Sequence, residues 1–174
     1  MEKYIPKIYK KSILDIDYKE LKKNNIKCLL FDLDNTILEV NNSIPKKEIC
    51  SLIKKLNKDF KIIIISNNTS KKRLSKAADE LEVDYIKFAL KPSSKAFRKV
   101  QKKYGYKKEE MCIIGDQLIT DIKGGNNYNV FTILVDPLDD KQELIVTGIN
   151  RYFEGKILKK LAKENKLKRG EYYG

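Results

Sequence analysis

The stretch CLLFDLDNTIL, residues 28–38, runs from an apolar segment straight into two aspartates that a single leucine separates. Its first half is apolar on successive residues rather than on alternate ones, which is typical of a parallel strand covered on both faces. In sheets of parallel strands, ligands bind in the crevice beyond the carboxyl ends of the strands. The stretch therefore predicts a buried strand that places Asp32 and Asp34 where a site would lie.

Further apolar runs of the same character follow along the chain. They predict five strands, at 27–33, 61–66, 84–88, 111–114 and 130–135. Apolar residues at helical spacing predict helices between them, at 45–57, 71–81 and 94–104, with a short helix at 18–24 before the first strand. Strands that alternate with helices predict a single α/β domain, with a doubly wound, mostly parallel five-stranded sheet and helices on both faces.

Residues that commonly begin or end helices support these boundaries. Ser70 and Ser93 are expected N-caps, and Gly105 is expected to end the third helix in a left-handed conformation. Gly124 and Gly125 are predicted to form the turn that leads into the fifth strand.

The composition indicates one globular domain and excludes several kinds of chemistry. With 174 residues, 41% hydrophobic and 35% charged, the chain can form one core, and its apolar runs fall far short of the roughly 20 residues that span a bilayer. There is no histidine, which excludes Ser–His catalysis and histidine metal ligands. The three cysteines lack zinc-ligand spacing, and the first residues lack a secretory h-region, so we expect a cytoplasmic protein.

Polar side chains gather where three predicted strands end. They are Asp32, Asp34 and Thr36 after the first strand, Ser66 and Asn67 after the second, and Asp116 after the fourth, with Asp121 five residues on. DLDNT alone also fits an ordinary turn, and it lacks the Gly and Glu that an EF-hand loop requires. Aspartates brought to one edge would repel one another unless a divalent cation lay among them, and oxygen ligands without histidine favour Mg²⁺.

Four short motifs lie in order along the chain: DLDNT at 32–36, SNN at 66–68, Lys91 within LKPSS, and GDQLITD at 115–121. In this order they resemble the motifs of the haloacid dehalogenase (HAD) superfamily of aspartyl phosphotransferases. With ALKP, GDQLITDIKGG and the later RYFE, the sequence further resembles the capless, subclass IIIA branch called YqeG-type. That branch is related to the phosphatases that convert phosphatidylglycerophosphate to phosphatidylglycerol. The resemblance covers about residues 4–154.

The resemblance implies a role for each motif residue. Asp32 would be the nucleophile that forms an aspartyl phosphate, and Asp34 would protonate the leaving oxygen and later deprotonate water. The ligands of Mg²⁺ would be Asp32, the main-chain carbonyl of Asp34, Asp116 and, through water or by orienting its neighbours, Asp121. The transferring phosphoryl group would be held by Thr36, which also fits a plain turn residue, and by Ser66, Asn67 and Lys91.

The spacing between motifs leaves no room for a cap domain. There are 29 residues between Thr36 and Ser66 and 22 between Asn68 and Lys91, and one helix and one strand already occupy each interval. An uncovered site implies a substrate that brings its own cover, such as a macromolecule, a membrane surface or another subunit.

The end of the chain is strongly basic. We divide the sequence into a phosphatase domain at 1–155 and a basic amphipathic segment at 156–174, in which apolar residues recur at helical spacing among lysines. This segment fits a helix on anionic lipid, a helix docked on the domain, or a disordered tail. The net charge of +13 favours an anionic partner.

The hypothesis we favour is a Mg²⁺-dependent phosphatase that acts on phosphatidylglycerophosphate at the cytoplasmic face of a membrane, with peripheral contact to that membrane. One alternative is a capless phosphatase that acts on nucleic-acid ends, phosphoproteins or small phosphate esters, because the charge fits nucleic acid as well as lipid. Another is a non-catalytic assembly module. The sequence indicates no oligomeric state.

Overall fold

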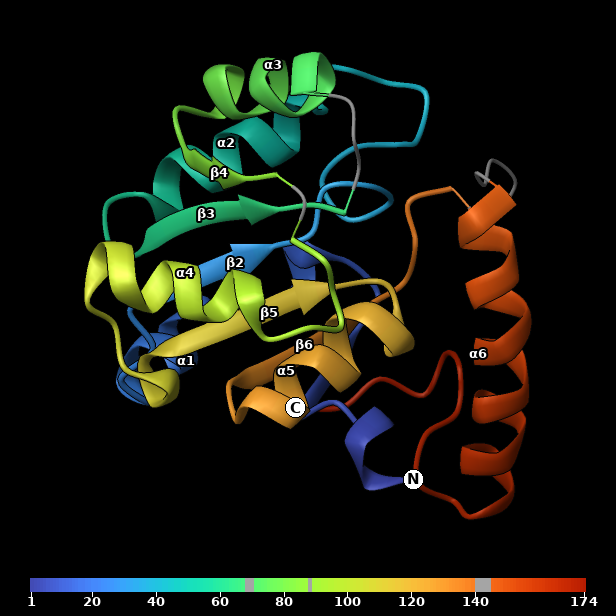
Figure 1. The fold of residues 1–174 in the computed structure, drawn as a ribbon. Coiled ribbons are helices and arrows are strands. Elements are labelled where there is room, and N and C mark those ends of the chain that lie inside the picture. Colours follow the sequence, from blue (N-terminus) through green and yellow to red (C-terminus); the bar gives the residue numbers. More distant parts are fainter. Residues whose placement is uncertain (68–70, 88, 140–144) are drawn as a thin grey trace.

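In the computed structural model, a six-stranded sheet lies between two layers of helices (Figure 1). The structure describes residues 1–67, 71–87, 89–139 and 145–174, with the main chain alone at residues 71 and 145–151. The strands are β1 (Ile8–Lys10), β2 (Cys28–Phe31), β3 (Lys61–Ile65), β4 (Asp84–Ile86), β5 (Met111–Gly115) and β6 (Phe131–Val135). They lie in the order β1-β6-β5-β2-β3-β4, and every pair is parallel.

The sheet has one strand more than the five predicted. The additional strand, β1, pairs with β6 at the edge of the sheet, with Ile8 opposite Ile133. It has three residues, of which only Tyr9 is buried, so it lacks the apolar run that marks the other strands. This segment is a strand because it pairs with β6, which lies more than 100 residues further along the chain. A local sequence pattern cannot predict such pairing.

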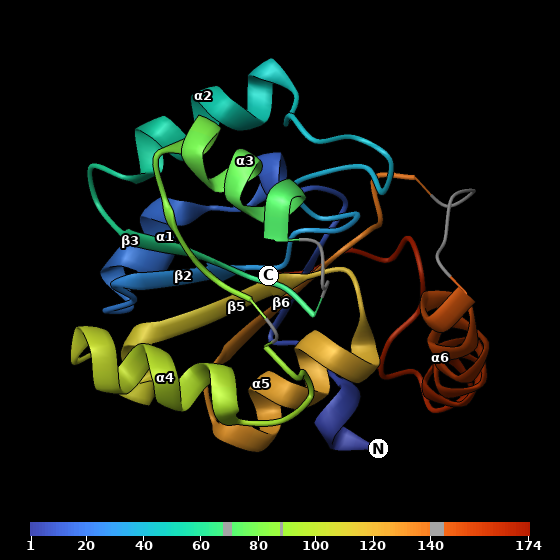
Figure 2. The same cartoon turned by 45° about the horizontal axis from the view of Figure 1, so that its top comes forward.

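Helices cover both faces of the sheet, as predicted. The longer ones are α1 (Tyr18–Lys23), α2 (Lys47–Leu56), α3 (Lys71–Leu81), α4 (Lys95–Tyr104), α5 (Lys123–Tyr128) and α6 (Ile145–Lys163). The short turns are η1 (Glu2–Tyr4), η2 (Ile13–Asp15), η3 (Lys108–Glu110) and the π-helical η4 (Leu118–Ile122). Helices α2 and α3 lie on one face and α4 and α5 on the other, while α6 stands beside the carboxyl ends of the strands (Figures 1 and 2).

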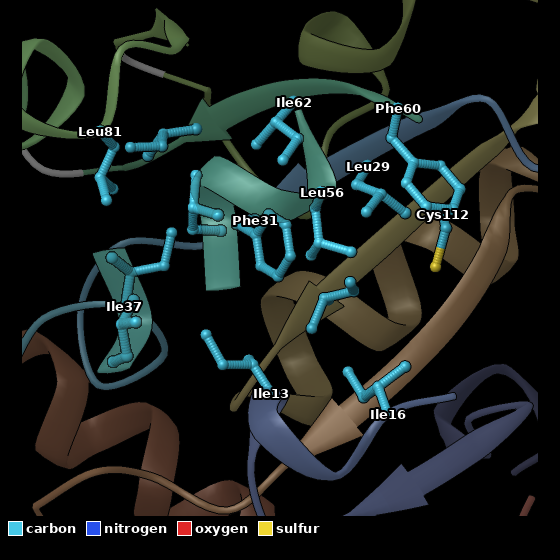
Figure 3. Packing of buried hydrophobic residues seen from close by; sticks show 14 of the residues in the cluster. Ile13, Ile16, Leu29, Phe31, Ile37, Leu56, Phe60, Ile62, Leu81 and Cys112 are labelled. Carbon is cyan, nitrogen blue, oxygen red and sulfur yellow. The ribbon is translucent and has the colours of Figure 1, made fainter. Parts of the chain in front are cut away.

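Successive residues of each strand enter two separate cores. Leu29 and Phe31 of β2 pack in a cluster with residues of α1, α2 and α3, which Figure 3 shows from close by. Cys28 and Leu30 pack on the opposite face with Phe97 of α4 and other residues of that layer. The unbroken apolar run of β2 follows from this burial on both sides.

The helix ends differ in part from the predictions. Gly105 ends α4 with a φ of +78°, as predicted, but the N-cap of α4 is Ser94 rather than Ser93. The predicted turn at Gly124 and Gly125 is wrong, because both residues lie inside α5. A β-carbon on Gly125 would lie 2.5 Å from Cγ2 of Ile113, so glycine lets the helix approach the sheet. Ser70 and Phe88, at the predicted ends of a helix and of a strand, lie outside the described residues.

The chain's end packs on the sheet domain. Helix α6 runs across the boundary at residue 155, and Leu161 and Leu167 are buried in a cluster with Leu118, Ile122 and other residues. Tyr173 forms an antiparallel bridge with Tyr9 of β1. Within the described part of the chain, no helix has both the length and the apolar character needed to cross a membrane.

Candidate active site

The carboxyl ends of neighbouring strands bring together acidic side chains that are far apart in the sequence. Asp32 follows β2, Asp116 follows β5, and Asp121 lies in η4. Each offers a carboxylate oxygen, these oxygens lie within 4.8 Å of one another, and all three residues are buried. Ser66, which directly follows β3, is buried as well.

Asp121 reaches this cluster because η4 turns back towards the end of β5. A β-carbon on Gly115 would lie 2.3 Å from Cγ of Asp121, so only glycine leaves room for the carboxylate. The main-chain N–H of Gln117 donates to Oδ2 of Asp121 at 3.2 Å. In the GD pair of the fourth motif, the glycine therefore makes space and Asp116 supplies a carboxylate.

Lys91 is the cation of the cluster. Its ammonium group donates to Oδ1 of Asp32 and, at 2.6 Å, to Oδ1 of Asp121, and only 2% of its side chain is exposed. Asn67 holds the main chain of this lysine, because its amide donates to the Lys91 carbonyl at 3.0 Å and accepts the Lys91 N–H at 2.8 Å. Asn67 thus acts on the cluster by positioning Lys91. Its neighbour in the motif, Asn68, lies outside the described residues.

The cluster gathers three carboxyl groups around one ammonium group. Burial raises the pKa of Asp32 well above its ordinary value, and the neighbouring carboxylates add to this rise while Lys91 opposes it. Burial alone would lower the pKa of Lys91, but the carboxylates of Asp121 and Asp32 outweigh it and hold that pKa above its ordinary value. If all three carboxyl groups are ionised, one ammonium group leaves an excess of negative charge in a buried place, which a bound divalent cation would offset. The all-oxygen donor set and this excess fit a hard divalent cation.

Thr36 and Asp34 lie beside the cluster in different ways. The hydroxyl of Thr36 donates to Oδ1 of Asp116 at 3.3 Å, and Thr36 is buried, so it orients a carboxylate of the cluster. The Asp34 side chain is 23% exposed and lies outside the three-carboxylate group. It forms an ion pair with Arg73 of α3.

Two charged residues near this edge were not predicted from the sequence. Besides Asp34, Arg73 binds two main-chain carbonyls of the loop between β2 and α2. Glu154 of α6 is buried and accepts the main-chain N–H of Ile119, in η4, at 2.8 Å. The rarity of arginine, with four in the chain, was the only signal for Arg73, and the position of Glu154 in RYFE was the only signal for Glu154.

Comparisons with known proteins agree with this geometry. A family model described as "HAD-hydrolase-like" matches residues 89–140, which include Lys91, Asp116 and Asp121. The chain is 33% identical over 165 residues to "Probable phosphatase YqeG" of Bacillus subtilis (strain 168), covering 94% of this chain and 95% of that protein. It is 25% identical over 167 residues to phosphatidylglycerophosphate phosphatase 1, chloroplastic/mitochondrial, of Arabidopsis thaliana, covering 90% of this chain but 47% of that protein.

Solved structures support the fold. An uncharacterized protein from Listeria monocytogenes serotype 4b superimposes with a TM-score of 0.55 at 18% identity, over 69% of this chain and 86% of that one. Among the described residues, no segment forms a separate cap domain over the carboxylates. The near full-length match to YqeG extends the family assignment to the whole chain. The chain therefore belongs to the HAD-like hydrolases and is a phosphatase of the family that includes YqeG.

Proposed function

We propose that this phosphatase is a Mg²⁺-dependent phosphomonoester hydrolase in which Asp32 is the nucleophile. The observation that carries the proposal is the setting of Asp32, which is buried at the end of β2, bound by Lys91, and beside the carboxylates of Asp116 and Asp121. A carboxylate held in this way needs little reorientation before it attacks phosphorus.

The reaction would run in two displacements. In the first, an oxygen of Asp32 bonds to phosphorus while the bond to the leaving oxygen breaks, and Asp34 gives that oxygen a proton. In the second, Asp34 takes a proton from water, the water oxygen bonds to phosphorus, and the bond to Asp32 breaks. Phosphate leaves, Asp32 is free again, and Asp34 carries the proton for the next cycle.

The remaining residues would bind the phosphoryl group and the metal. Lys91 and Ser66 would hold the phosphoryl oxygens, with Asn67 acting through Lys91 and Thr36 through Asp116. Bound Mg²⁺ would offset the negative charge of the carboxylates and of the phosphoryl group. Its ligands would be Asp32, Asp116, Asp121 and the main-chain carbonyl of Asp34.

We infer that the substrate is phosphatidylglycerophosphate. The Arabidopsis relative named for this activity aligns with 90% of this chain. The carboxylates have no cap domain over them in the described structure, which suits a substrate presented by a surface. The net charge of +13 suits an anionic lipid.

The distribution of exposed apolar side chains supports contact with a bilayer. Among the described residues, the large apolar side chains that are well exposed are Leu14, Ile44, Leu90, Tyr152, Phe153 and Tyr172. The first three lie on segments that follow strand ends, and Tyr152 and Phe153 lie on α6 beside Glu154, which contacts η4. The hydroxyl of Tyr172 donates to Asp136, the residue after β6. All six therefore lie at the carboxyl edge, by which we mean the side of the molecule where the strands end. There they would make peripheral contact with the cytoplasmic face of a membrane.

A phosphate-release assay tests the proposal. Purified protein in mixed micelles containing phosphatidylglycerophosphate should release phosphate when Mg²⁺ is present. It should release none after chelation, and none when Asp32 is replaced in Asp32→Asn. No release from the lipid, combined with Mg²⁺-dependent hydrolysis of an aryl phosphate, would reject the lipid substrate and keep the mechanism.

The same assay separates the other substrate classes. Oligonucleotide ends, a phosphopeptide and sugar phosphates are compared with the lipid at equal concentration. Faster release from oligonucleotide ends than from the lipid would favour nucleic acid as the substrate. Undiminished hydrolysis by Asp32→Asn would reject the aspartyl-phosphate mechanism for every substrate.

A further inference from the structure

Arg73 connects three parts of the molecule near the proposed proton donor. It is the third residue of α3, and 14% of its side chain is exposed. Its Nη1 donates to Oδ1 of Asp34, its Nη2 to the carbonyl of Glu39 at 2.8 Å, and its Nε to the carbonyl of Asn42 at 2.7 Å. Each nitrogen of the guanidinium group therefore donates to an acceptor outside α3.

We use the name β2–α2 loop for residues 35–46, the part of the connection between β2 and α2 that follows Asp34, and both carbonyls belong to it. Within this loop the N–H of Asn42 donates to the Glu39 carbonyl at 3.0 Å, and Lys46 pairs with the Glu39 carboxylate at 2.8 Å. These contacts hold the loop together, but Arg73 joins it to both Asp34 and α3. One rigid planar group thus bonds both to the loop and to the Asp34 carboxylate.

The choice of arginine matches this geometry. The chain has four arginines among its 37 basic residues, so lysine is its usual cation. A lysine ammonium is a single point charge on a flexible stem, whereas a guanidinium group presents donors in a fixed plane. Only arginine can hold a carboxylate oxygen and two carbonyls in one plane from this position.

We propose that Arg73 is a positioning residue for catalysis and acts through Asp34. By fixing Oδ1, the guanidinium group sets the direction of the other carboxylate oxygen, so that Asp34 meets the leaving oxygen of the substrate. This inference rests on the proposed function, because it takes Asp34 as the group that protonates the leaving oxygen.

A plain structural role makes a different prediction. If Arg73 only anchored the β2–α2 loop, its loss would lower the activity on every substrate by the same factor. If it acts through Asp34, its loss matters most where the leaving group needs a proton and least where the leaving group departs as a stable anion. The dependence on the leaving group therefore separates positioning from anchoring.

The experiment measures kcat/KM with Mg²⁺ for phenyl phosphate, which has a poor leaving group, and for dinitrophenyl phosphate, which has a good one. For Arg73→Met we expect a loss of about 10- to 100-fold on phenyl phosphate and less than about threefold on dinitrophenyl phosphate. Arg73→Lys should recover part of the loss on phenyl phosphate, because it restores the charge without the planar donors. The matched control is Lys72→Met, which removes an exposed charge from the adjacent position and should leave both values unchanged.

Thermal unfolding of each variant checks that it folds, and Arg73→Lys serves if Arg73→Met does not. Equal losses on the two esters, or no loss on either, would overturn the inference. Asp34→Asn, measured in parallel, should show the same selective loss in stronger form. If Asp34→Asn shows no dependence on the leaving group, the proposed role of Asp34 fails; if Asp34→Asn shows it and the Arg73 variants do not, only the role of Arg73 fails.

Discussion

The same kinds of charged group lie at the amino edge, where the strands begin, and at the carboxyl edge, where the strands end. They are partly exposed at the amino edge and buried at the carboxyl edge. At the amino edge Lys27 pairs with Glu110 at 2.5 Å and Lys61 pairs with Asp84, with 53% of the Lys27 side chain and 34% of the Lys61 side chain exposed. At the carboxyl edge Lys91 is 2% exposed and bonds to carboxylates that are at most 9% exposed. Water screens the pairs at the amino edge, and little of it reaches the cluster at the carboxyl edge.

The difference supports the proposal that the carboxyl edge carries the active site. Exposed pairs contribute about 0–1 kcal/mol each, and removing charges from water costs several kcal/mol per ion, so a buried charge cluster is poor evidence of selection for stability. A hollow of about 830 Å³ lies at the amino edge, lined by Pro6, Asn126 and other residues. The volume of this pocket would thus place the active site at the amino edge, whereas buried charge places it at the carboxyl edge. Buried charge is the better guide here, because phosphoryl transfer needs fixed charges.

The largest expected effect is on catalysis. Asp32→Asn should lower phosphate release from an aryl phosphate by about a thousandfold or more, because it removes the proposed nucleophile. Asp84→Asn, the same change at the amino edge, should leave the rate within about twofold of the unmodified protein. Comparable losses in the two variants would show that the edges do not differ in function.

The next effect is on stability. In the presence of a chelator, Lys91→Met should lower the free energy of unfolding by about 3 kcal/mol, because it leaves buried carboxylates without the lysine ammonium group. Lys61→Met should cost less than about 1 kcal/mol, since the Lys61 pair is partly exposed. Urea unfolding with a chelator measures both variants. Equal costs would mean that burial does not distinguish the two lysines.

A smaller effect is expected for membrane contact. Replacing Tyr152 and Phe153 together by alanine should weaken binding to phosphatidylglycerol vesicles about tenfold, because two exposed aromatic side chains no longer enter the interface. Tyr104→Ala, which removes an aromatic side chain near the amino edge, should leave this binding unchanged. Vesicle sedimentation measures the binding, and equal weakening in both variants would argue against a membrane surface at the carboxyl edge.

The contrast between the edges also explains what the sequence could predict. Unbroken apolar runs reveal β2, β3, β5 and β6, and the polar residues after them identify the edge where Asp32 and Asp116 meet. A strand buried on both faces has to be apolar throughout, so its pattern is local. Its end is therefore also visible in the sequence.

Other features depend on partners far along the chain. β1 is defined by pairing with β6. Two of the three acceptors of Arg73 are main-chain carbonyls, whose positions no side-chain pattern encodes. The sequence suggested that Gly125 forms a turn, but it lies inside a helix. Glycine is needed there because a β-carbon would collide with Ile113 and Thr132 of the sheet. Such contacts become visible only once the chain is folded.

The smallest expected effect is the pH dependence of the Asp84 pair. A side-chain hydrogen bond from Lys61 holds the pKa of Asp84 below its ordinary value. The pair therefore stabilises the fold above the unfolded-state pKa of about 3.9, and this contribution is lost as the pH falls through the lower folded-state pKa. Because 39% of the Asp84 side chain is exposed, the effect should be a few tenths of a kcal/mol. Urea unfolding between about pH 2 and pH 6 should show a slightly shallower acid loss in Asp84→Asn. Asp32 should affect the stability in the opposite direction, because its pKa is raised in the folded protein. When a chelator keeps metal away, ionisation of Asp32 should therefore destabilise the protein as the pH rises. If Asp84→Asn lowered the free energy of unfolding at neutral pH as much as Lys91→Met does, the prediction that the exposed Lys61–Asp84 pair contributes little to stability would be wrong.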